Sequence, residues 1–468
     1  MKQINGQRVA ILIPIGLAAG MAIALILWLG PWNKHLQLRV PGTDRPPGME
    51  ATDDLNPVQN GRVILGDGKP CDLAGAWTGF RGNLRDGKTT DSASLAHSWQ
   101  SGEPRELWSV DVGEGYAGAA VLNGRVFLMD YDQQKKQDAL RCLSLADGKE
   151  IWRFAYRNPV KRNHGMSRTV PALTEKFVVA LGPKCHVVCV NAVSGELRWC
   201  LDLVRQYGTT VPPWYAGQCP LIDQGKVILA PGGTNALMVA VDIETGNEVW
   251  RTPNPNGWKM THSSIMPVEF GGERMLVYCA NLGVIGVSAT DGRLLWETTE
   301  WKIGLATVPS PLVVEDGRIF LSGGYNSGSM MLELIRDGER FSVKGRFRLA
   351  PEVFGATQHT PILHEGHFYG VRPDGKFVCL DLDGKPLWVS ETGQDFGLGS
   401  FIFADGAFYA MNDTGKLRMI EANAEKYHLL GETQVLKGRE SWAPLAIAGG
   451  RLLVRDLTRL VCLNIANH

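Results

Sequence analysis

The sequence lacks a surplus of charge of either sign. Its 468 residues include 48 Lys+Arg and 48 Asp+Glu, so the formal net charge is +0. A general nucleic-acid-binding protein needs a cationic surface to hold phosphates, and this balance argues against one. A disordered chain is excluded as well, because 44% of the residues are hydrophobic and only 21% are charged.

Cysteines are few, and no two are adjacent. Nine is an odd number, which leaves at least one thiol unpaired. Four of them, Cys142, Cys189, Cys379 and Cys462, occupy one equivalent position of a repeat, where we expect small buried hydrophobic side chains. The C-x3-C spacing that starts at Cys185 has little metal specificity. We therefore predict no metal site.

Signatures of a catalytic nucleophile are missing from the polar loops at 260–264 and 323–328. Neither contains the Gly-x-Ser-x-Gly spacing of a nucleophile elbow. The segment His364–His367 resembles a zinc motif only superficially, because its two histidines are not four residues apart on a helix. We predict no catalytic residue.

The amino terminus contains a long uncharged run, from Val9 to Leu29. A helix of that length would measure about 31 Å, enough to cross a bilayer. We expect a cytoplasmic segment at 1–8, a transmembrane signal-anchor at 9–30 and a Pro-rich linker at 31–75. The alternative is a cleaved signal peptide. The expected location is the inner membrane, single-pass, with the remaining chain in the periplasm.

One pattern recurs along residues 100 to 468. An apolar strand enters an Asp-Gly or Ser/Thr-Gly turn, and the next strand carries a Trp. The interval is roughly 46 residues, within the 40 to 50 typical of propeller blades with four strands each. A second hairpin precedes each copy, and a Pro opens most inner strands. The Trp residues that mark the copies are Trp108, Trp152, Trp199, Trp250, Trp296 and Trp388.

The repeat count predicts eight blades. Six periods separate Trp108 from Trp388, and the chain after Trp388 is about one strand too short for two more. The segment Arg105 to Val110 can supply that strand. The predicted fold class is all-β: an eight-bladed β-propeller of four-stranded antiparallel blades at 76–468, closed by the N-terminal strand.

The Asp/Thr-Gly-x-x-x-Trp repeats resemble the pyrroloquinoline quinone (PQQ) repeat family, which includes quinoprotein alcohol dehydrogenases and the outer-membrane assembly factor BamB. The segment Trp77 to Gly87 is similar to the Trp-x-x-Phe-Arg-Gly-x-x-Arg-Asp-Gly opening of BamB-like exported propellers. Arg81 and Arg85 in that segment can bind carboxylates or carbonyls. We interpret it as a structural cap, with a partner site as the alternative.

The resemblance to the family's enzymes is incomplete. They carry adjacent cysteines over the quinone and a Glu/Asn/Asp calcium set, and this sequence has no adjacent cysteines. We therefore expect no cofactor; PQQ with Ca2+ would be required only by an enzymatic function. BamB is a lipoprotein, whereas the first cysteine here is Cys71, outside any lipobox.

Candidate binding residues lie just before the Pro residues that open the inner strands, at one mouth of the central channel. A Pro-Pro-aromatic loop adds two exposed hot-spot side chains. Their mixture of aromatic, cationic and imidazole groups suits a polar or anionic ligand, although they could equally fill and solvate the mouth. The predicted site comprises Tyr116, Arg168, Trp214, Tyr215, Gln218, His262, His359 and Trp442.

Two functions follow from these features. The first is a membrane-anchored, BamB-like binding or scaffold module whose partners are envelope proteins or a small polar ligand. The alternative is a quinoprotein-type oxidoreductase, or another enzyme of small ligands, that uses the central funnel. The missing cysteine pair and calcium set favour the binding module.

Overall fold

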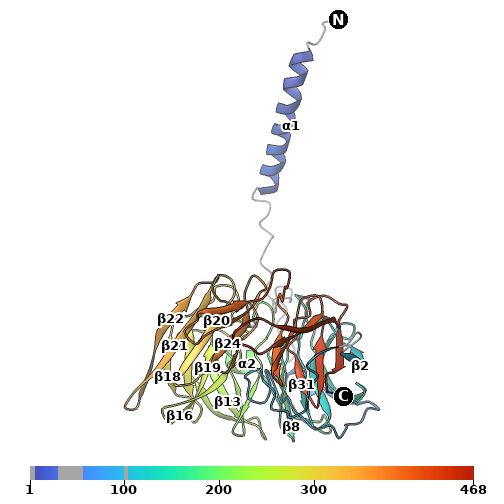
Figure 1. Cartoon of the computed structure of the whole chain (residues 1–468), viewed down its shortest axis with the longest axis vertical. Helices are drawn as coiled ribbons and strands as arrows, with labels where there is room; N and C mark the ends of the chain where they lie inside the picture. The colour runs from blue at the N-terminus through green and yellow to red at the C-terminus, as the bar shows by residue number, and fades with distance from the viewer. Residues whose placement is uncertain (1–5, 30–55, 100–103, 468) are drawn as a thin grey trace. The chain divides into compact units, whose positions relative to one another are not determined.

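The structure is a computed structural model that describes residues 6–29, 56–99 and 104–467. The chain divides into two units, Met1–Thr43 and Asp44–His468. The first contains helix α1 (Gly6–Leu29), and the second contains all of the strands (Figure 1). The first part of the predicted linker, 31–55, lies outside the described residues.

Eight antiparallel sheets form the blades of a β-propeller, as predicted. Their innermost strands are β3 (Ala120–Leu122), β7 (Ala172–Leu173), β11 (Leu221–Asp223), β15 (Met266–Phe270), β19 (Leu312–Val314), β23 (Ile362–His364), β27 (Phe401–Ala404) and β31 (Ala446–Ala448). The second strands are β4 (Arg125–Asp132), β8 (Phe177–Leu181), β12 (Lys226–Leu229), β16 (Glu273–Cys279), β20 (Arg318–Gly323), β24 (His367–Val371), β28 (Ala407–Met411) and β32 (Arg451–Arg455).

The outer half of each blade completes the four strands. The third strands are β5 (Gln137–Ser144), β9 (His186–Asn191), β13 (Met238–Asp242), β17 (Val284–Ser288), β21 (Gly328–Asp337), β25 (Phe377–Leu380), β29 (Lys416–Glu421) and β33 (Arg459–Asn464). The outer strands are β6 (Glu150–Arg157), β10 (Leu197–Asp202), β14 (Glu248–Thr252), β18 (Leu294–Thr298), β22 (Arg340–Leu349), β26 (Pro386–Val389), β30 (Leu429–Gln434) and β2 (Arg105–Asp111).

Three short elements lie outside this scheme. Strand β1 (Arg62–Leu65) adds a fifth strand to the first blade by pairing with β6. A 3-10 turn, η2 (Pro57–Asn60), precedes it, and helix α2 (Leu203–Tyr207) follows β10. The second half of the predicted linker therefore packs on the propeller.

Strand β2 belongs to the last blade, although it comes first among the propeller strands in sequence. It pairs antiparallel with β33, from Arg105 opposite Asn464 to Asp111 opposite Arg459. Figure 1 shows β2 in cyan beside the red C-terminal strands.

The repeated Trp and Gly residues meet between neighbouring blades. Trp152 of the first blade packs on Gly195 of the second, where an added Cβ would lie 2.7 Å from the indole ring. Trp199 packs on Gly246 in the same way, and its indole N–H donates to the Ile243 carbonyl at 2.7 Å. The Gly residue serves two purposes there, since it adopts a positive φ and leaves room for the indole.

The contact is missing where the repeat is degenerate. In the fifth blade the equivalent Gly338 has nothing within 4 Å of an added Cβ. Trp296 of the fourth blade instead packs on Gly286 of its own blade, and its indole nitrogen faces the Met275 sulfur at 3.3 Å. The joint between these two blades is made by other apolar side chains, including Trp301 and Ile303.

The predicted inner-membrane location is wrong. Helix α1 is present, but its side chains are described only for 15–27. Within the part of the chain that the structure describes, no helix has both the length and the apolar character needed to cross a membrane.

We predict that Gly195→Ala destabilises the propeller more than Gly338→Ala. Both glycines have a positive φ, +73° and +62°, so each alanine bears backbone strain of about 1–2 kcal/mol. Only the Cβ at Gly195 also collides with an indole, which adds about 1–3 kcal/mol of overpacking. Urea unfolding of the two variants measures the difference, and equal losses would contradict this account of the joint.

Candidate functional site

An N-terminal segment fills one part of the central channel. The backbone of Trp77 exchanges two hydrogen bonds of 2.8 Å with Val121 of β3. Lys88 forms a parallel bridge with Phe403 of β27. The segment 75–97, which we call the plug, therefore spans inner strands on different sides of the propeller.

Arg81 fixes the plug to the sixth blade. Its guanidinium group donates to the carbonyls of Thr360 at 2.6 Å and Pro361 at 2.8 Å, the two residues that precede β23. Within the plug it also donates to the carbonyls of Arg85 and Asp86. All four acceptors are main-chain oxygens, so Arg81 is held by carbonyls of the plug and of the sixth blade.

Arg85 makes fewer hydrogen bonds than Arg81. Its Nη1 donates to the Pro220 carbonyl at 3.2 Å, and its guanidinium lies 5.8 Å from the centre of the Phe80 ring. Its Nε and Nη2 are buried without a hydrogen-bond partner. Burial lowers the pKa of both plug arginines to about 10, so both remain cationic at neutral pH.

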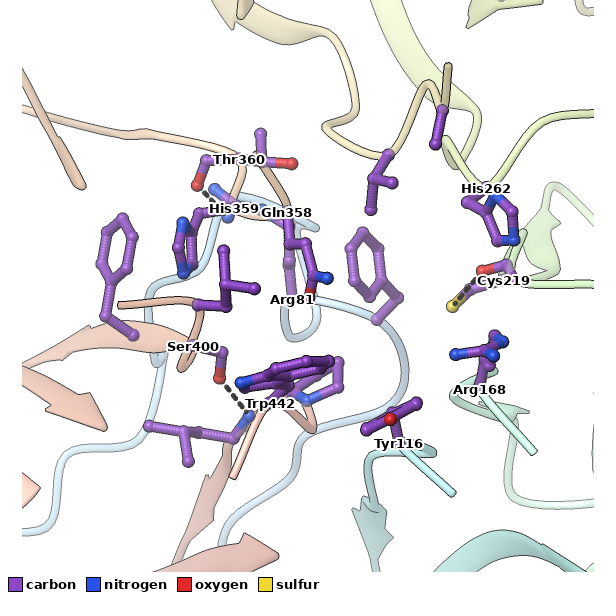
Figure 2. A pocket seen from close by; sticks show the side chains of 18 of the residues that line it. Arg81, Tyr116, Arg168, Cys219, His262, Gln358, His359, Thr360, Ser400 and Trp442 are labelled. Atoms are coloured by element: carbon purple, nitrogen blue, oxygen red, sulfur yellow. Dashed lines mark hydrogen bonds between the residues drawn. The ribbon is translucent and has the colours of Figure 1, made fainter. Parts of the chain in front are cut away.

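We call the loops that precede the inner strands the mouth. A cavity of about 400 Å³ lies between the plug and the mouth. Trp77, Phe80 and Arg81 of the plug form part of its wall. Tyr325, which is 44% exposed, brings the cavity to the surface. Six predicted residues also line it (Figure 2): Tyr116, Arg168, Trp214, His262, His359 and Trp442.

Two stacked aromatic rings make one rigid wall. The rings of Tyr116 and Trp442 are 5.2 Å apart and inclined by 20°. The Tyr116 hydroxyl donates to Glu440 Oε2 at 2.5 Å, and the Trp442 indole N–H donates to Asp413 Oδ1 at 2.7 Å. Each ring is thus held at its polar end, which limits its rotation before any ligand arrives.

Arg168 joins this wall to the Pro-Pro-aromatic loop. Its guanidinium carbon lies 5.0 Å from the centre of the Tyr116 ring, within cation–π range. Its Nε donates to the Trp214 carbonyl at 2.5 Å, and its Nη2 donates to the carbonyls of Asn163 and His164. Burial lowers the pKa of Arg168 to about 10, which still leaves it charged at neutral pH.

Two of the three histidines in the lining, His262 and His359, lie on opposite sides of the cavity in Figure 2. His359 is buried with neither ring nitrogen in a hydrogen bond, and Nε2 of His262 has no partner. Burial lowers the pKa of each imidazole to about 4, and nearby Arg168 contributes at His262. Both rings are consequently neutral near pH 7, with unused hydrogen-bonding nitrogens.

Two predicted residues lie outside the cavity wall. Gln218 is buried and bridges to the end of β12, where its Oε1 accepts from the Ala230 N–H at 2.8 Å. Tyr215 is buried as well, and its hydroxyl donates to the Lys161 carbonyl at 2.5 Å. Both side chains support the mouth loops, so the expected exposure of Tyr215 is wrong.

Sequence reasoning missed that the plug supplies part of the wall. The motif from Trp77 onward was expected to cap the propeller, but nothing in its spacing shows that Phe80 and Arg81 reach into the channel. Tyr325 and Gln358 also line the cavity. Tyr325 lies in the polar loop 323–328, whose composition was the one available signal.

The donor set does not suit a calcium-bound quinone. Ca2+ takes six to eight oxygen ligands, with carboxylates prominent among them. No Asp or Glu is among the described residues that line the cavity, whereas two arginines are. Over the described residues as a whole, no group of three His, Cys, Asp or Glu side chains is placed to hold a metal.

Eight four-stranded blades with recurring Trp–Gly joints define a PQQ-repeat β-propeller. A model of the family described as outer membrane protein assembly factor BamB matches residues 135–388, more than half of the chain. The chain belongs to this family.

Two solved structures agree on the fold, and a third is similar at a lower score. BamB from Moraxella catarrhalis is similar with a TM-score of 0.53 and 13% identity, over 77% of this chain and 99% of that one. The computationally designed Ika8 protein has a TM-score of 0.50 and 11% identity, over 77% of this chain and 100% of that one. The quinohemoprotein alcohol dehydrogenase from Comamonas testosteroni has a TM-score of 0.45 and 11% identity, over 84% of this chain and 81% of that one. No curated protein matches the chain.

The two plug arginines should contribute differently to stability. Arg81→Met removes four hydrogen bonds and leaves buried carbonyls unpaired, so we expect a loss of about 2–4 kcal/mol in the free energy of unfolding. Arg85→Met removes one long bond and two unpaired donors, and we expect a loss below about 1 kcal/mol. Denaturant titration compares them, and an equal or reversed order would refute the assignment.

Proposed function

We propose that this protein is a binding module that holds a partner protein at the mouth of its propeller. The assembly role in the name of its family supports a partner among the proteins that build the outer membrane. The propeller supplies the scaffold, because its joints and plug fix the mouth loops in place. Recognition then depends on the side chains presented there, chiefly Tyr116, Arg168 and Trp442.

One observation carries this proposal over an enzymatic role. General acid–base catalysis works best with a group whose pKa lies near the working pH. Two of the three histidines that line the cavity, His262 and His359, have a pKa of about 4, and Arg81 and Arg168 have a pKa of about 10. The pKa of Tyr116 is raised further from neutrality by burial and by Glu440. Tyr116, the two arginines and these two histidines are therefore suited to binding and orienting a partner at neutral pH rather than to exchanging a proton.

Cross-linking in cells that produce the chain tests the proposal. Trp442→Ala removes the half-buried indole of the stacked wall, and we expect at least a tenfold loss of a cross-linked protein partner, identified by mass spectrometry. Val249→Ala, on the exposed edge strand β14, is the matched control and should leave the partner in place. A partner that survives Trp442→Ala, with the fold verified by circular dichroism, argues against the mouth as the docking site.

The predicted ring closure is also part of this proposal. The pairing of β2 with β33 and the contact between β3 and β31 support a ring that closes through its N-terminal strand. Trp108 on β2 reaches the first blade, where its indole N–H donates to the Leu145 carbonyl at 3.0 Å. The closed ring keeps both ends of the blade series from exposing a free sheet edge.

Trp108→Ala should loosen this junction before the other blades. We expect a loss of about 3–5 kcal/mol, together with faster hydrogen exchange in the amides of β33 than in those of β17. Hydrogen exchange read by mass spectrometry resolves the two strands. Unchanged protection of β33 would show that β2 does not secure the last blade.

A further inference from the structure

The geometry points to a carboxylate-binding site in the cavity between the plug and the mouth. The inference rests on the proposed binding function and names the group that is bound there: a carboxylate attached to an apolar body. A partner protein can supply it from its chain end or a side chain, and a free organic acid carries the same group.

Charge is the first reason. Arg81 and Arg168 line the cavity, and their hydrogen bonds go to main-chain carbonyls. Among the described residues no carboxylate forms an ion pair with either one, although Asp86 lies near Arg81 and Glu440 lies near Arg168. The neighbouring acids are already engaged, since Glu440 accepts from Tyr116 and Asp413 accepts from Trp442. Two guanidinium groups at one cavity without an ion-pair partner favour an anion from outside.

Unused donors are the second reason. Arg168 bonds through Nε and Nη2, which leaves Nη1 free of any described hydrogen bond. His359 is more than nine-tenths buried and uses neither ring nitrogen, and His262 leaves Nε2 unused. A neutral imidazole donates from one nitrogen, and the backbone at Trp214 and Tyr215 uses that of His262, so the cavity offers a carboxylate the Arg168 guanidinium and the His359 imidazole as donors.

The remaining wall selects an apolar body. Phe80, Val308, Leu398 and Ile402 line the cavity beside the Tyr116–Trp442 stack. A volume of about 400 Å³ is within the range of small-ligand pockets. A compact, fully hydrated anion such as phosphate would leave this apolar wall uncovered, whereas an aryl or alkyl acid covers it and presents two oxygens to the donors.

Titration calorimetry with the full chain tests the assignment through a matched pair of probes. 3-Phenylpropionate should bind, and 3-phenylpropionamide, which has the same shape without the charge, should bind at least tenfold more weakly. Inorganic phosphate should not compete. Equal binding of acid and amide, binding of neither, or displacement of the acid by phosphate would each overturn the proposal.

A histidine variant locates the site without disturbing the plug. His359→Leu removes a side chain that makes no hydrogen bond in the protein, and it should weaken 3-phenylpropionate binding at least fivefold. His428→Leu removes a histidine whose Nδ1 lies 2.9 Å from Glu421 Oε2, away from the cavity lining, and should leave binding unchanged. Unchanged binding in His359→Leu would show that the carboxylate does not bind in this cavity.

Two peptides identify the source of the carboxylate. If a chain end is the natural group, acetylated tetraalanyl-leucine with a free carboxyl end binds more tightly than its amidated form. If a small molecule is the natural ligand, 3-phenylpropionate binds and neither peptide does. Either result supports the carboxylate site. Failure here is distinct from failure of the proposed function, because a cross-linked partner can persist when no carboxylate binds, and the reverse also holds.

Discussion

The contact between an indole and a glycine is the constraint on which the propeller depends. Each such joint requires a flat, large side chain on the outer strand of one blade and the absence of a side chain on the turn of the next, as at Trp152 and Gly195. The indole N–H adds direction where it meets a carbonyl, as Trp199 does at Ile243. Repetition of this joint sets the angle between blades, and the angle sets how many blades surround the channel.

The channel is then divided by the plug into a filled part and a cavity. Arg81 takes part in both, since it ties the plug to the sixth blade and forms part of the cavity wall. Tyr116 and Trp442 likewise join structure and recognition, because their polar ends are held by Glu440 and Asp413 while their side chains line the cavity. Such preorganisation lowers the conformational cost of binding.

The propeller could be predicted from the sequence because its signal is repeated and local. The Trp register gave the eight blades and the place of β2, and the X-Gly turns appear with the positive φ expected, as at Asn123 and Gln224. The direction in which individual side chains point was harder to predict. Spacing put Gln218 and Tyr215 at the mouth, but packing turned both inward. The path of the plug depends on contacts far apart in sequence, which no local pattern encodes.

The plug also constrains the order in which the chain can fold. Its partners extend from Val121 to Ala466, which pairs with Leu95. At roughly 5–20 residues per second, a ribosome makes the final strand on the order of tens of seconds after the plug. During that interval Trp77 and Phe80 have no complete channel to enter. A nascent chain of this protein therefore exposes these aromatic side chains until the last strand has been made.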